Sequence, residues 1–315
     1  LKEKYNLWTR TESDCEVLLA MYLKDSRSTR NFGSIRGEFA FVLFDLKLGL
    51  VIYGRDMCGV RPLFISLYGF SLASELKGLS DVGVQVAPGK IHTYDIFKKM
   101  KNVQEISYPI ELYKPLSITL EEAVKRRLES EREVGFLLSG GFDSSIILSM
   151  ASKYLALSDK EIEVFTVGFS QDAPDVIASQ KVIAYLEGIY GKRFIHHIII
   201  LTIEEGLKAV PEVIKSIESF DTTTVRASVP MWLMAKYIRE NTNVKVVLSG
   251  EGSDELNGSY FYFHYAPNGT EFDQERRRLL ANIHYFDGLR ADRCISAHGL
   301  ELRVPFLDDM VVRTF

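Results

Sequence analysis

Residues 134–145 read Val-Gly-Phe-Leu-Leu-Ser-Gly-Gly-Phe-Asp-Ser-Ser, and this stretch decides the fold of the second part of the chain. An apolar run leads into a turn of small residues, and a helical pattern begins at Asp143. A strand that turns through glycines into a helix directs backbone N–H groups, and the positive end of the helix, at one point. The stretch therefore predicts a binding site for a phosphate group.

The spacing distinguishes this loop from common nucleotide-binding motifs. No Gly-Lys-Ser/Thr follows the glycines, as a Walker A loop requires, and the loop does not fit G-x-G-x-x-G. Serine hydroxyls and the Asp143 carboxylate suit pyrophosphate with Mg²⁺, because hard cations prefer carboxylate oxygens. The alternative interpretation is a chance turn of small residues between a strand and a helix.

A second loop repeats this design further along the chain. Residues 246–255 read Val-Val-Leu-Ser-Gly-Glu-Gly-Ser-Asp-Glu, an apolar strand followed by small residues and carboxylates. Asp143 and Asp254 could share one or two Mg²⁺ ions, and Glu251 lies between glycines, where its carboxylate can approach a substrate. The structural alternative is that Glu251, Asp254 and Glu255 cap the helix that follows.

Helical patterns and short apolar runs alternate around the two loops. Strands are expected at residues 134–138, 163–169, 194–200 and 244–248, and helices at 143–157, 175–189, 204–219 and 229–240. This alternation predicts an α/β domain with a parallel sheet covered by helices. Ligands of such sheets bind beyond the carboxyl ends of the strands, where both loops fall.

The first part of the chain is β-rich instead. Residues 39–45 and 50–54 predict a hairpin, residues 63–67 and 70–73 predict another pair of strands, and residues 13–23 predict a helix. The organisation changes between Pro109 and Pro115. The predicted domains are therefore residues 1–110 and residues 115–315.

The bulk composition excludes several classes of protein. With a net charge of −4, the chain has no global basic field that would favour nucleic acid or an anionic membrane as a partner. No apolar run approaches the roughly 18 residues of a membrane span, and no signal peptide opens the chain. Three separated cysteines indicate neither a disulfide framework nor a zinc site. We therefore expect a cytoplasmic protein with no membrane or nucleic-acid partner.

The two loops together resemble those of a known family. Ser-Gly-Gly-x-Asp-Ser-Ser resembles the ATP pyrophosphatase loop of enzymes that release pyrophosphate from ATP, and Ser-Gly-Glu-Gly-Ser-Asp-Glu is typical of asparagine synthetases. The resemblance covers nearly the whole chain. It implies that residues 115–315 form an α/β synthetase domain of the ATP pyrophosphatase, or adenine nucleotide α-hydrolase-like, type.

Phrases in the first part resemble the glutaminase domain of the same family. They are Ser-Asp-Cys-Glu at 13–16, Gly-Glu-Phe-Ala-Phe at 37–41, Gly-Arg-Asp at 54–56, Gly-Val-Arg-Pro-Leu at 59–63 and Ala-Ser-Glu-Leu-Lys at 73–77. The resemblance implies an α+β domain of layered β-sheets. Asp14 would hold the α-ammonium group of glutamine; the alternative role is the N-cap of its helix, and the two roles could coexist.

The chain also departs from the family pattern. That glutaminase uses an amino-terminal cysteine as nucleophile, followed by Arg-Gly-Pro-Asp and Asn-Gly-Glu segments, and the chain opens at Leu1 without them. Cys15 and Cys58 are interpreted as structural. We therefore expect a glutaminase-type domain that lacks its amino-terminal part. The synthetase domain is expected to lack its C-terminal part, which in the family carries a lysine thought to stabilise the adenylation transition state.

The resemblance assigns roles to residues by position. Glu251 would be the general base toward ammonia, and Asp143 and Asp254 would bind Mg²⁺. The predicted contacts with ATP and pyrophosphate are Leu137, Ser139, Gly140, Gly141, Asp143, Ser144, Ser145, Val167, Ser249 and Gly250. Thr223 and Arg226 offer a hydroxyl and a guanidinium suited to the carboxylate of aspartate, with a polar helix N-terminus as the alternative.

The implied activity is the ATP-dependent amidation of L-aspartate to L-asparagine. It would pass through β-aspartyl-AMP and release AMP and pyrophosphate, with ATP and Mg²⁺ as cofactors and ammonia supplied directly or from L-glutamine. A homodimer is one option for the assembly. Two rivals stay open: a β-lactam-forming relative, which Glu251 opposes, and a non-catalytic nucleotide-binding or regulatory paralogue, which the absent nucleophile favours.

Overall fold

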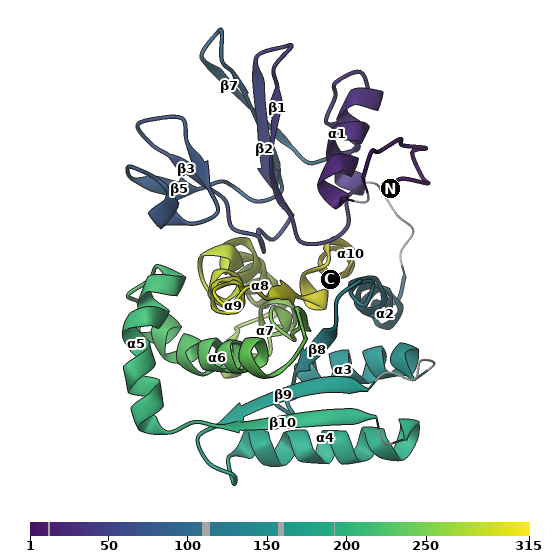
Figure 1. The fold of residues 1–315 in the computed structure, drawn as a ribbon, viewed down its shortest axis with the longest axis vertical. Coiled ribbons are helices and arrows are strands. Elements are labelled where there is room, and N and C mark those ends of the chain that lie inside the picture. Colours follow the sequence, from purple (N-terminus) through teal and green to yellow (C-terminus); the bar gives the residue numbers. More distant parts are fainter. Residues whose placement is uncertain (12, 109–113, 157–160, 192) are drawn as a thin grey trace. The chain divides into compact units, whose positions relative to one another are not determined.

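The computed structural model describes residues 1–11, 13–108, 114–156, 161–191 and 193–315. Two compact units divide the chain, Leu1–Tyr113 and Lys114–Phe315 (Figure 1). Within the described ranges, no helix has the length and apolar composition needed to cross a membrane.

Unit 1 contains two antiparallel sheets. The larger has the order β1 (Ala40–Asp45), β2 (Leu50–Arg55), β6 (Lys90–Asp95) and β7 (Met100–Glu105). The smaller has the order β4 (Leu72–Ala73), β3 (Phe64–Ser66) and β5 (Gly83–Gln85). The predicted hairpin is confirmed, because β1 and β2 pair along their whole lengths and the Asp45 carboxylate accepts hydrogen bonds from the N–H groups of the turn between them.

The layers of unit 1 follow from the alternation of side chains along β2. Ile52 packs in one apolar cluster with Tyr22 of helix α1 (Asp14–Lys24), whereas Val51 and Tyr53 pack in another with Ile65 of the smaller sheet. Successive side chains of a strand point to opposite faces, so β2 is buried on both sides. Figure 1 shows α1 and β3 on opposite sides of β2. The predicted α+β fold of layered sheets is confirmed.

Unit 2 is built on a five-stranded sheet in which every neighbouring pair is parallel. Its order is β10 (Phe194–Ile200), β9 (Ile162–Gly168), β8 (Val134–Leu137), β11 (Val246–Leu248) and β12 (Glu301–Arg303). The chain runs outward from β8 to β10, then returns and runs outward from β11 to β12 on the other side. The strand order therefore reverses between β8 and β11, which is where open α/β sheets form their ligand-binding crevice.

Helices cover both faces of this sheet, which confirms the predicted α/β class. One face packs in a large apolar core with α2 (Leu116–Arg127), α3 (Phe142–Leu155), α4 (Pro174–Tyr190) and α10 (Asp309–Thr314). The other is covered by α6 (Thr222–Asn241), which contacts β9, and by α9 (Asp287–Ser296), which contacts β12. Helix α5 (Ile203–Ile217) packs on α6 and α9 and begins with a capping box of Thr202 and Glu205.

One predicted helix boundary is wrong. The sequence predicts a helix from residue 229, but α6 begins at Thr222, because the Asp221 carboxylate caps it by accepting the Thr224 N–H at 2.7 Å. Pro230, which suggests a boundary, lies inside the helix. Helix α6 is therefore longer than predicted, and it packs on β9.

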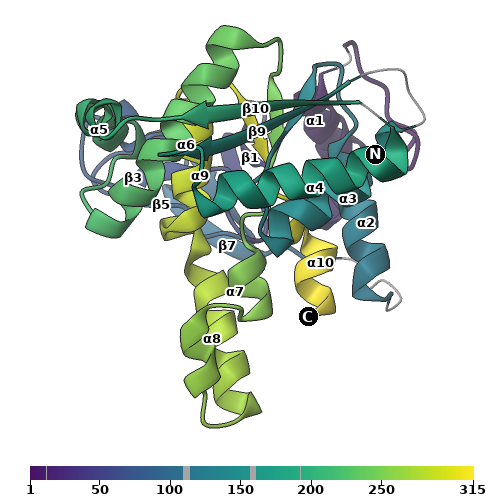
Figure 2. The ribbon, with the colours of Figure 1, turned by 90° about the horizontal axis from the view of Figure 1, so that it is seen from below.

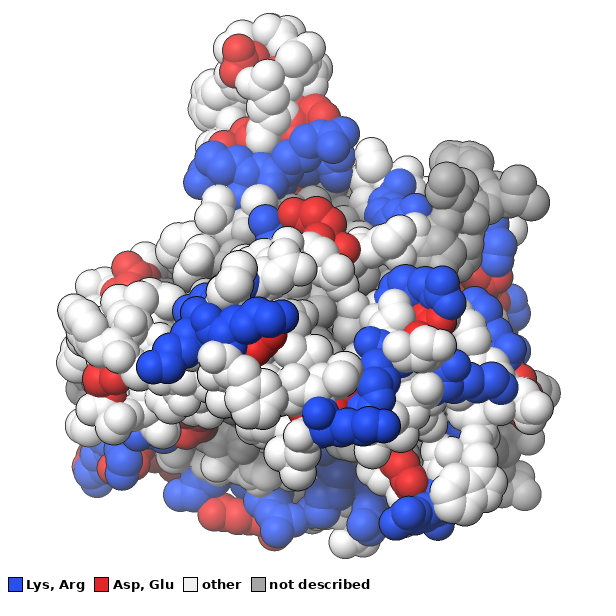
Figure 3. Space-filling model, turned by 90° about the horizontal axis from the view of Figure 1, so that it is seen from above, with Lys and Arg blue, Asp and Glu red and all other residues white. Residues whose placement is uncertain are grey.

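The segment between β11 and β12 contains the helix expected directly after the second loop and further helices that the sequence pattern did not predict. Helix α7 (Ser253–Asn257) follows the second loop directly, and α8 (Gly269–Asn282) projects from unit 2 (Figure 2). Figure 3 shows basic and acidic side chains next to one another on this projection, where Arg276 and Arg277 pair with Asp273. Ion pairs between neighbouring side chains of opposite charge stabilise an exposed helix. Because both charges are present, this helix carries no continuous patch of positive or negative charge.

Candidate active site

The first loop is held in shape by its own serines. The Ser139 N–H donates to Ser144 Oγ at 3.2 Å, and the Ser145 hydroxyl donates to the Gly141 carbonyl at 2.6 Å. Gly140 has a φ of +81°, and a Cβ there would lie 2.4 Å from the backbone nitrogen of Ser179 in α4. A glycine is therefore required both by the backbone conformation and by the close approach of α4.

The second loop touches the first through backbone. A Cβ on Gly250 would lie 2.9 Å from the Ser144 nitrogen and 3.0 Å from the Asp143 carbonyl carbon. The Ser253 hydroxyl donates to Asp143 Oδ1 at 2.5 Å, although 110 residues separate the two in sequence. The loops that follow β8 and β11 thus form one site at the point where the strand order reverses.

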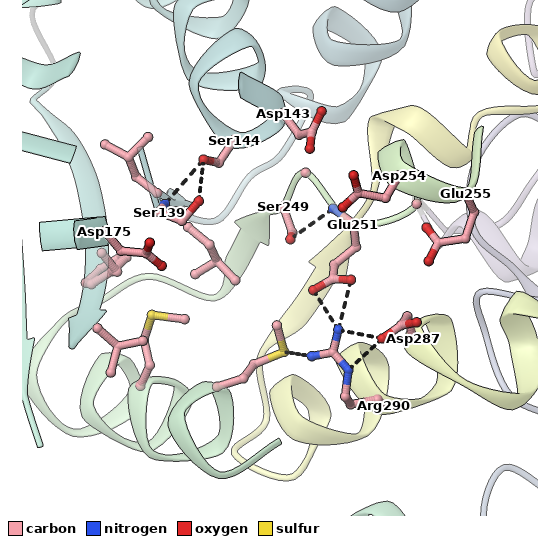
Figure 4. Close-up of a pocket in the computed structure, with 18 of the residues that line it drawn as sticks. Ser139, Asp143, Ser144, Asp175, Ser249, Glu251, Asp254, Glu255, Asp287 and Arg290 are labelled. Atoms are coloured by element: carbon pink, nitrogen blue, oxygen red, sulfur yellow. Dashed lines mark hydrogen bonds and ion pairs between the residues drawn. The ribbon is translucent and has the colours of Figure 1, made fainter. Parts of the chain in front are cut away.

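A cavity of about 330 Å³ opens between these loops (Figure 4). Its lining comes from both loops, from β9 and from helices α4, α6, α7 and α9. The lining residues are Leu137, Leu138, Ser139, Asp143, Ser144, Phe165, Val167, Asp175, Met231, Met234, Ser249, Gly250, Glu251, Gly252, Asp254, Glu255, Tyr260, Asp287 and Arg290.

Most of the residues predicted to bind the nucleotide or the metal, and the predicted catalytic residue Glu251, line this cavity. They are Leu137, Ser139, Asp143, Ser144, Val167, Ser249, Gly250, Glu251 and Asp254. Gly140, Gly141 and Ser145 shape the first loop without appearing in the lining. The structure brings these residues together, and their contacts with ATP stay a prediction.

The residues predicted to bind amino acids lie elsewhere. Thr223 and Arg226 are exposed on the first turns of α6 and are not among the described residues that line the cavity, so the segment forms the polar helix N-terminus of the alternative interpretation. In unit 1, Asp14 is the first residue of α1, one position after the N-cap Ser13, and its carboxylate accepts the Cys15 N–H at 2.8 Å. Their roles in binding aspartate and glutamine stay predictions.

Glu251 is held by an arginine that the sequence did not single out. Nη2 of Arg290 lies 3.0 Å from each carboxylate oxygen of Glu251 and 3.0 Å from Asp287 Oδ1 (Figure 4). Burial raises the pKa of Glu251; Arg290 opposes this effect and Asp287 adds to it. Glu251 is therefore oriented toward Arg290 and does not cap α7, and its carboxylate has an increased affinity for a proton.

Two more acids extend the polar end of the cavity. Glu255, in the first turn of α7, accepts a hydrogen bond from the Tyr260 hydroxyl, and burial raises the pKa of Glu255 to about 7. The Ser259 hydroxyl donates to Asp254. Several carboxyl groups thus share a small volume, and their mutual repulsion favours a bound cation or a bound proton.

Asp143 and Asp254 have the character expected of a site for a hard cation. Burial raises the pKa of Asp143, the hydrogen bond from Ser253 opposes this, and the charge of Asp254 raises the pKa further. In the part of the chain that the structure describes, no group of three or more His, Cys, Asp or Glu residues could hold a metal ion by itself. Mg²⁺ usually binds through one or two carboxylates together with substrate phosphates and water, so this pair fits such an ion once a phosphate ligand is present.

Another part of the cavity lining is apolar, and we call it the apolar end. It comprises Phe165 and Val167 of β9 and Met234 of α6. Met231, also on α6, lies beside the acids, with its Sδ 3.7 Å from Arg290 Nη1. The cavity therefore combines an apolar end, a loop rich in glycine and serine, and an acidic end. Such a cavity can bind a ligand that has both a planar ring and phosphates.

Sequence reasoning missed several residues that line the cavity. Arg290 lies in the charged segment 289–308, which the family resemblance placed beside the aspartate and phosphate pocket, but no role was assigned to it. Asp287 lies just before that segment. Met231 and Met234 lie inside the helix predicted at 229–240, where nothing marks them as cavity residues. A signal was available for Asp175, because an acid directly after Pro174 belongs to a helix start near the carboxyl end of β9.

Comparison with known proteins identifies related families for both units. The asparagine synthase family matches residues 116–274 and 266–315, and the glutamine amidotransferase domain family matches residues 1–81. These matched segments lie in units 2 and 1, respectively.

Named relatives match nearly the whole chain. A probable glutamine-hydrolysing asparagine synthetase of Acanthamoeba polyphaga mimivirus is 39% identical over 98% of this chain and 60% of its own length. The glutamine-hydrolysing asparagine synthetases of Mus musculus and Homo sapiens are each 38% identical, with the same coverage. The chain spans about 60% of the length of these relatives.

One solved structure is similar at low sequence identity. It is an NH3-dependent NAD synthetase from Campylobacter jejuni, with a TM-score of 0.31 and 16% identity over 54% of this chain and 72% of that protein.

Proposed function

Because the chain belongs to the asparagine synthase family, we propose that it catalyses the ATP-dependent amidation of L-aspartate to L-asparagine. The observation that carries the proposal is the position of Glu251. Its carboxylate lies in the same cavity as the Ser139–Ser144 loop and is held there by Arg290. A nucleotide and a proton acceptor can therefore meet in one cavity.

The first step joins aspartate to AMP. A β-carboxylate oxygen of aspartate attacks the α-phosphorus of ATP, and the bond between that phosphorus and the pyrophosphate oxygen breaks. The apolar end, with Phe165 and Met234, would hold the adenine, and the first loop would bind the departing pyrophosphate. Asp143 and Asp254 would hold Mg²⁺, which when bound neutralises charge on the phosphates.

The second step forms the amide. Ammonia attacks the β-carbonyl carbon of β-aspartyl-AMP, AMP leaves with the electrons of the broken acyl–oxygen bond, and the nitrogen loses a proton. Glu251 would accept this proton, and its raised pKa makes its carboxylate a stronger base than an exposed glutamate. Arg290 orients the carboxylate and offsets part of the cost of its charge.

Unit 1 would supply the ammonia from L-glutamine. The support is the match of residues 1–81 to the glutamine amidotransferase domain family and the place of Asp14 at the start of α1. Thr223 and Arg226 would bind the carboxylate of aspartate. A cytoplasmic location belongs to the same proposal, supported by the free thiols of Cys15, Cys58 and Cys294. A homodimer is proposed from the sequence resemblance alone.

The test is aspartate-dependent release of pyrophosphate from Mg-ATP by the protein, with ammonium and then with glutamine as donor. Glu251→Gln is compared with Glu204→Gln, a matched control on exposed α5. We expect asparagine and AMP with ammonium, and loss of both in Glu251→Gln only. Nucleotide binding without aspartate-dependent pyrophosphate would overturn the proposal in favour of a regulatory paralogue. Pyrophosphate release tied to closure of an internal amide would favour the β-lactam-forming relative.

A further inference from the structure

Asp175 is set apart from the other acids of the cavity. In Figure 4, Asp143, Glu251, Asp254, Glu255 and Asp287 lie to the right, whereas Asp175 lies to the left and its carboxylate points inward. Among the described residues, no hydrogen bond or ion pair engages the Asp175 carboxylate. An unpaired carboxylate on the wall of a ligand cavity is available to accept hydrogen bonds from a ligand.

The helix that carries Asp175 touches the two walls that a nucleotide would bridge. At the end of β9, a Cβ on Gly168 would lie 2.8 Å from Val176 Cγ2, the next residue of α4. On the other side, a Cβ on Gly140 of the first loop would lie 2.5 Å from the Ala178 backbone of the same helix. The first turns of α4 are therefore wedged between the strand that carries Val167 and the loop that would hold phosphates.

The chemistry of a nucleotide places its ribose between these walls. The base belongs at the apolar end, the phosphates belong at the first loop, and the sugar connects them. The ribose of ATP presents two neighbouring hydroxyls, each a hydrogen-bond donor, and a carboxylate presents two acceptor oxygens. Bonds to an ionised acceptor are among the stronger hydrogen bonds in proteins.

We propose that Asp175 binds the ribose of the nucleotide and selects ATP over deoxynucleotides by accepting hydrogen bonds from the 2′- and 3′-hydroxyls. The proposal rests on the proposed function and extends it to the recognition of the sugar. Asp175 then has a separate task from Asp143 and Asp254, which face the phosphates. The competing interpretations are a favourable acid in the first turn of α4 and a further metal ligand.

The experiment compares ATP, 2′-deoxy-ATP and 3′-deoxy-ATP in wild-type protein and in Asp175→Ala and Asp175→Asn. Affinity is measured by calorimetry without aspartate, and KM is measured by pyrophosphate release. Asp172→Asn is the control, because Asp172 is exposed near the same helix start, is engaged by Ser170 and does not line the cavity. Thermal unfolding of each variant separates binding effects from folding effects.

We expect wild type and Asp172→Asn to bind ATP about tenfold to a hundredfold more tightly than 2′-deoxy-ATP. Asp175→Ala should reduce this ratio to about one, and Asp175→Asn, which keeps one acceptor oxygen, should lie between. A wild-type ratio in Asp175→Ala overturns the proposal, as does an equal loss of affinity for all three nucleotides. If excess Mg²⁺ restored the affinity of Asp175→Ala for ATP, Asp175 would be a metal ligand. That result would also overturn the proposal.

These outcomes are separable from a failure of the proposed function. If wild type binds ATP selectively but releases no pyrophosphate with aspartate, the amidation proposal fails and the ribose assignment stands. If turnover is normal and selectivity does not depend on Asp175, only the ribose assignment fails. A protein that binds none of the three nucleotides would overturn both.

Discussion

Asp308 and Glu251 are carboxylates of unit 2 that pair with arginines, yet the fold shifts their pKa values in opposite directions. Asp308 Oδ2 lies 2.8 Å from Arg127 Nη1 and 3.1 Å from Arg126 Nη2, and its Oδ1 accepts the Met310 N–H. Burial alone would raise the pKa of Asp308, but the two arginines outweigh it and the pKa is lowered. Glu251 has one arginine, which it shares with Asp287, and its pKa is raised.

The difference separates a fully compensated ion pair from a partly compensated one. The side chain of Asp308 is 0% exposed and joins α2 to the start of α10, so its charge is fully compensated inside the fold. The side chain of Glu251 is 19% exposed in a cavity, and its charge is only partly compensated. When neighbouring positive charges only partly offset the cost of burying a carboxylate, that carboxylate can take up and release a proton during a reaction.

Removal of Arg127 should produce the largest loss of stability. Arg127→Ala leaves a buried Asp308 with the half-exposed Arg126 alone, and breaking a buried pair typically costs about 3–5 kcal/mol. Denaturant unfolding followed by a signal from unit 2 measures the change. A loss below about 1 kcal/mol would show that Arg126 alone compensates Asp308.

Removal of the Glu251 carboxylate should affect the reaction and not the fold. Glu251→Gln should lower kcat for asparagine formation by about 10²–10⁴, the usual contribution of a general base. Its free energy of unfolding near neutral pH should be unchanged or higher, because the fold disfavours the ionised form. Asp308→Asn, measured in parallel, should be destabilised. Equal destabilisation of the two variants would remove the distinction between the pairs.

Glu255 should make stability depend on pH between its ordinary and its folded pKa. Because the folded pKa of about 7 exceeds the ordinary value of 4.5, the contribution is complete below about 4.5 and is lost as the pH rises through about 7. We expect a loss of roughly 3 kcal/mol over this window, and Glu255→Gln should flatten the pH dependence. For Asp308 the sign is opposite, since its contribution is present above the ordinary value of 3.8 and is lost as the pH falls through its lowered pKa. Unfolding at several pH values measures both.

The smallest effect is expected on the projecting helix α8. The side chain of Arg277 is 69% exposed and lies 2.6 Å from Asp273, a geometry as close as that of the buried pairs. Exposed pairs contribute about 0–1 kcal/mol, so Arg277→Ala should change the free energy of unfolding by less than about 1 kcal/mol, and less still at high salt. A change as large as that of Arg127→Ala would mean that distance, and not burial, decides the strength of these pairs.

The fold class was predictable because it follows from the local pattern of apolar and polar residues along the chain. Alternation predicted the β1–β2 hairpin, and the succession of strands and helices predicted the parallel sheet. The strand order was not predictable, because nothing near β11 in sequence indicates that it pairs with β8. The start of α6 was missed because the polar residues 222–228 were interpreted as a binding segment, with a helix N-terminus only as the alternative, although Asp221 caps the helix.

The two loops of the site were predictable, but the partner of Glu251 was not. Three arginines of one charged segment have three different partners: Arg290 binds Glu251, Arg293 binds Glu218 and Arg303 binds Glu301. Arg303 pairs with a neighbour on its own strand β12, whereas the partners of Arg290 and Arg293 depend on how α9 packs against the loop after β11 and against the end of α5. Tertiary packing therefore determines which arginine pairs with Glu251, and composition and spacing could not predict it.

The position of β8 between β9 and β11 has a consequence for the growing chain. During synthesis β9 soon follows β8, but the other edge of β8 has no partner until β11 is made, about 110 residues after the first loop. At roughly 5–20 residues per second this interval lasts about 5–20 s. Through it the ribosome-bound chain exposes an apolar strand edge of the kind that pairs with other chains. The late arrival of β11 covers this edge of β8, but the cavity is complete only when α9, with Asp287 and Arg290, has been made, so the exposed edge is protected before the ligand site is finished.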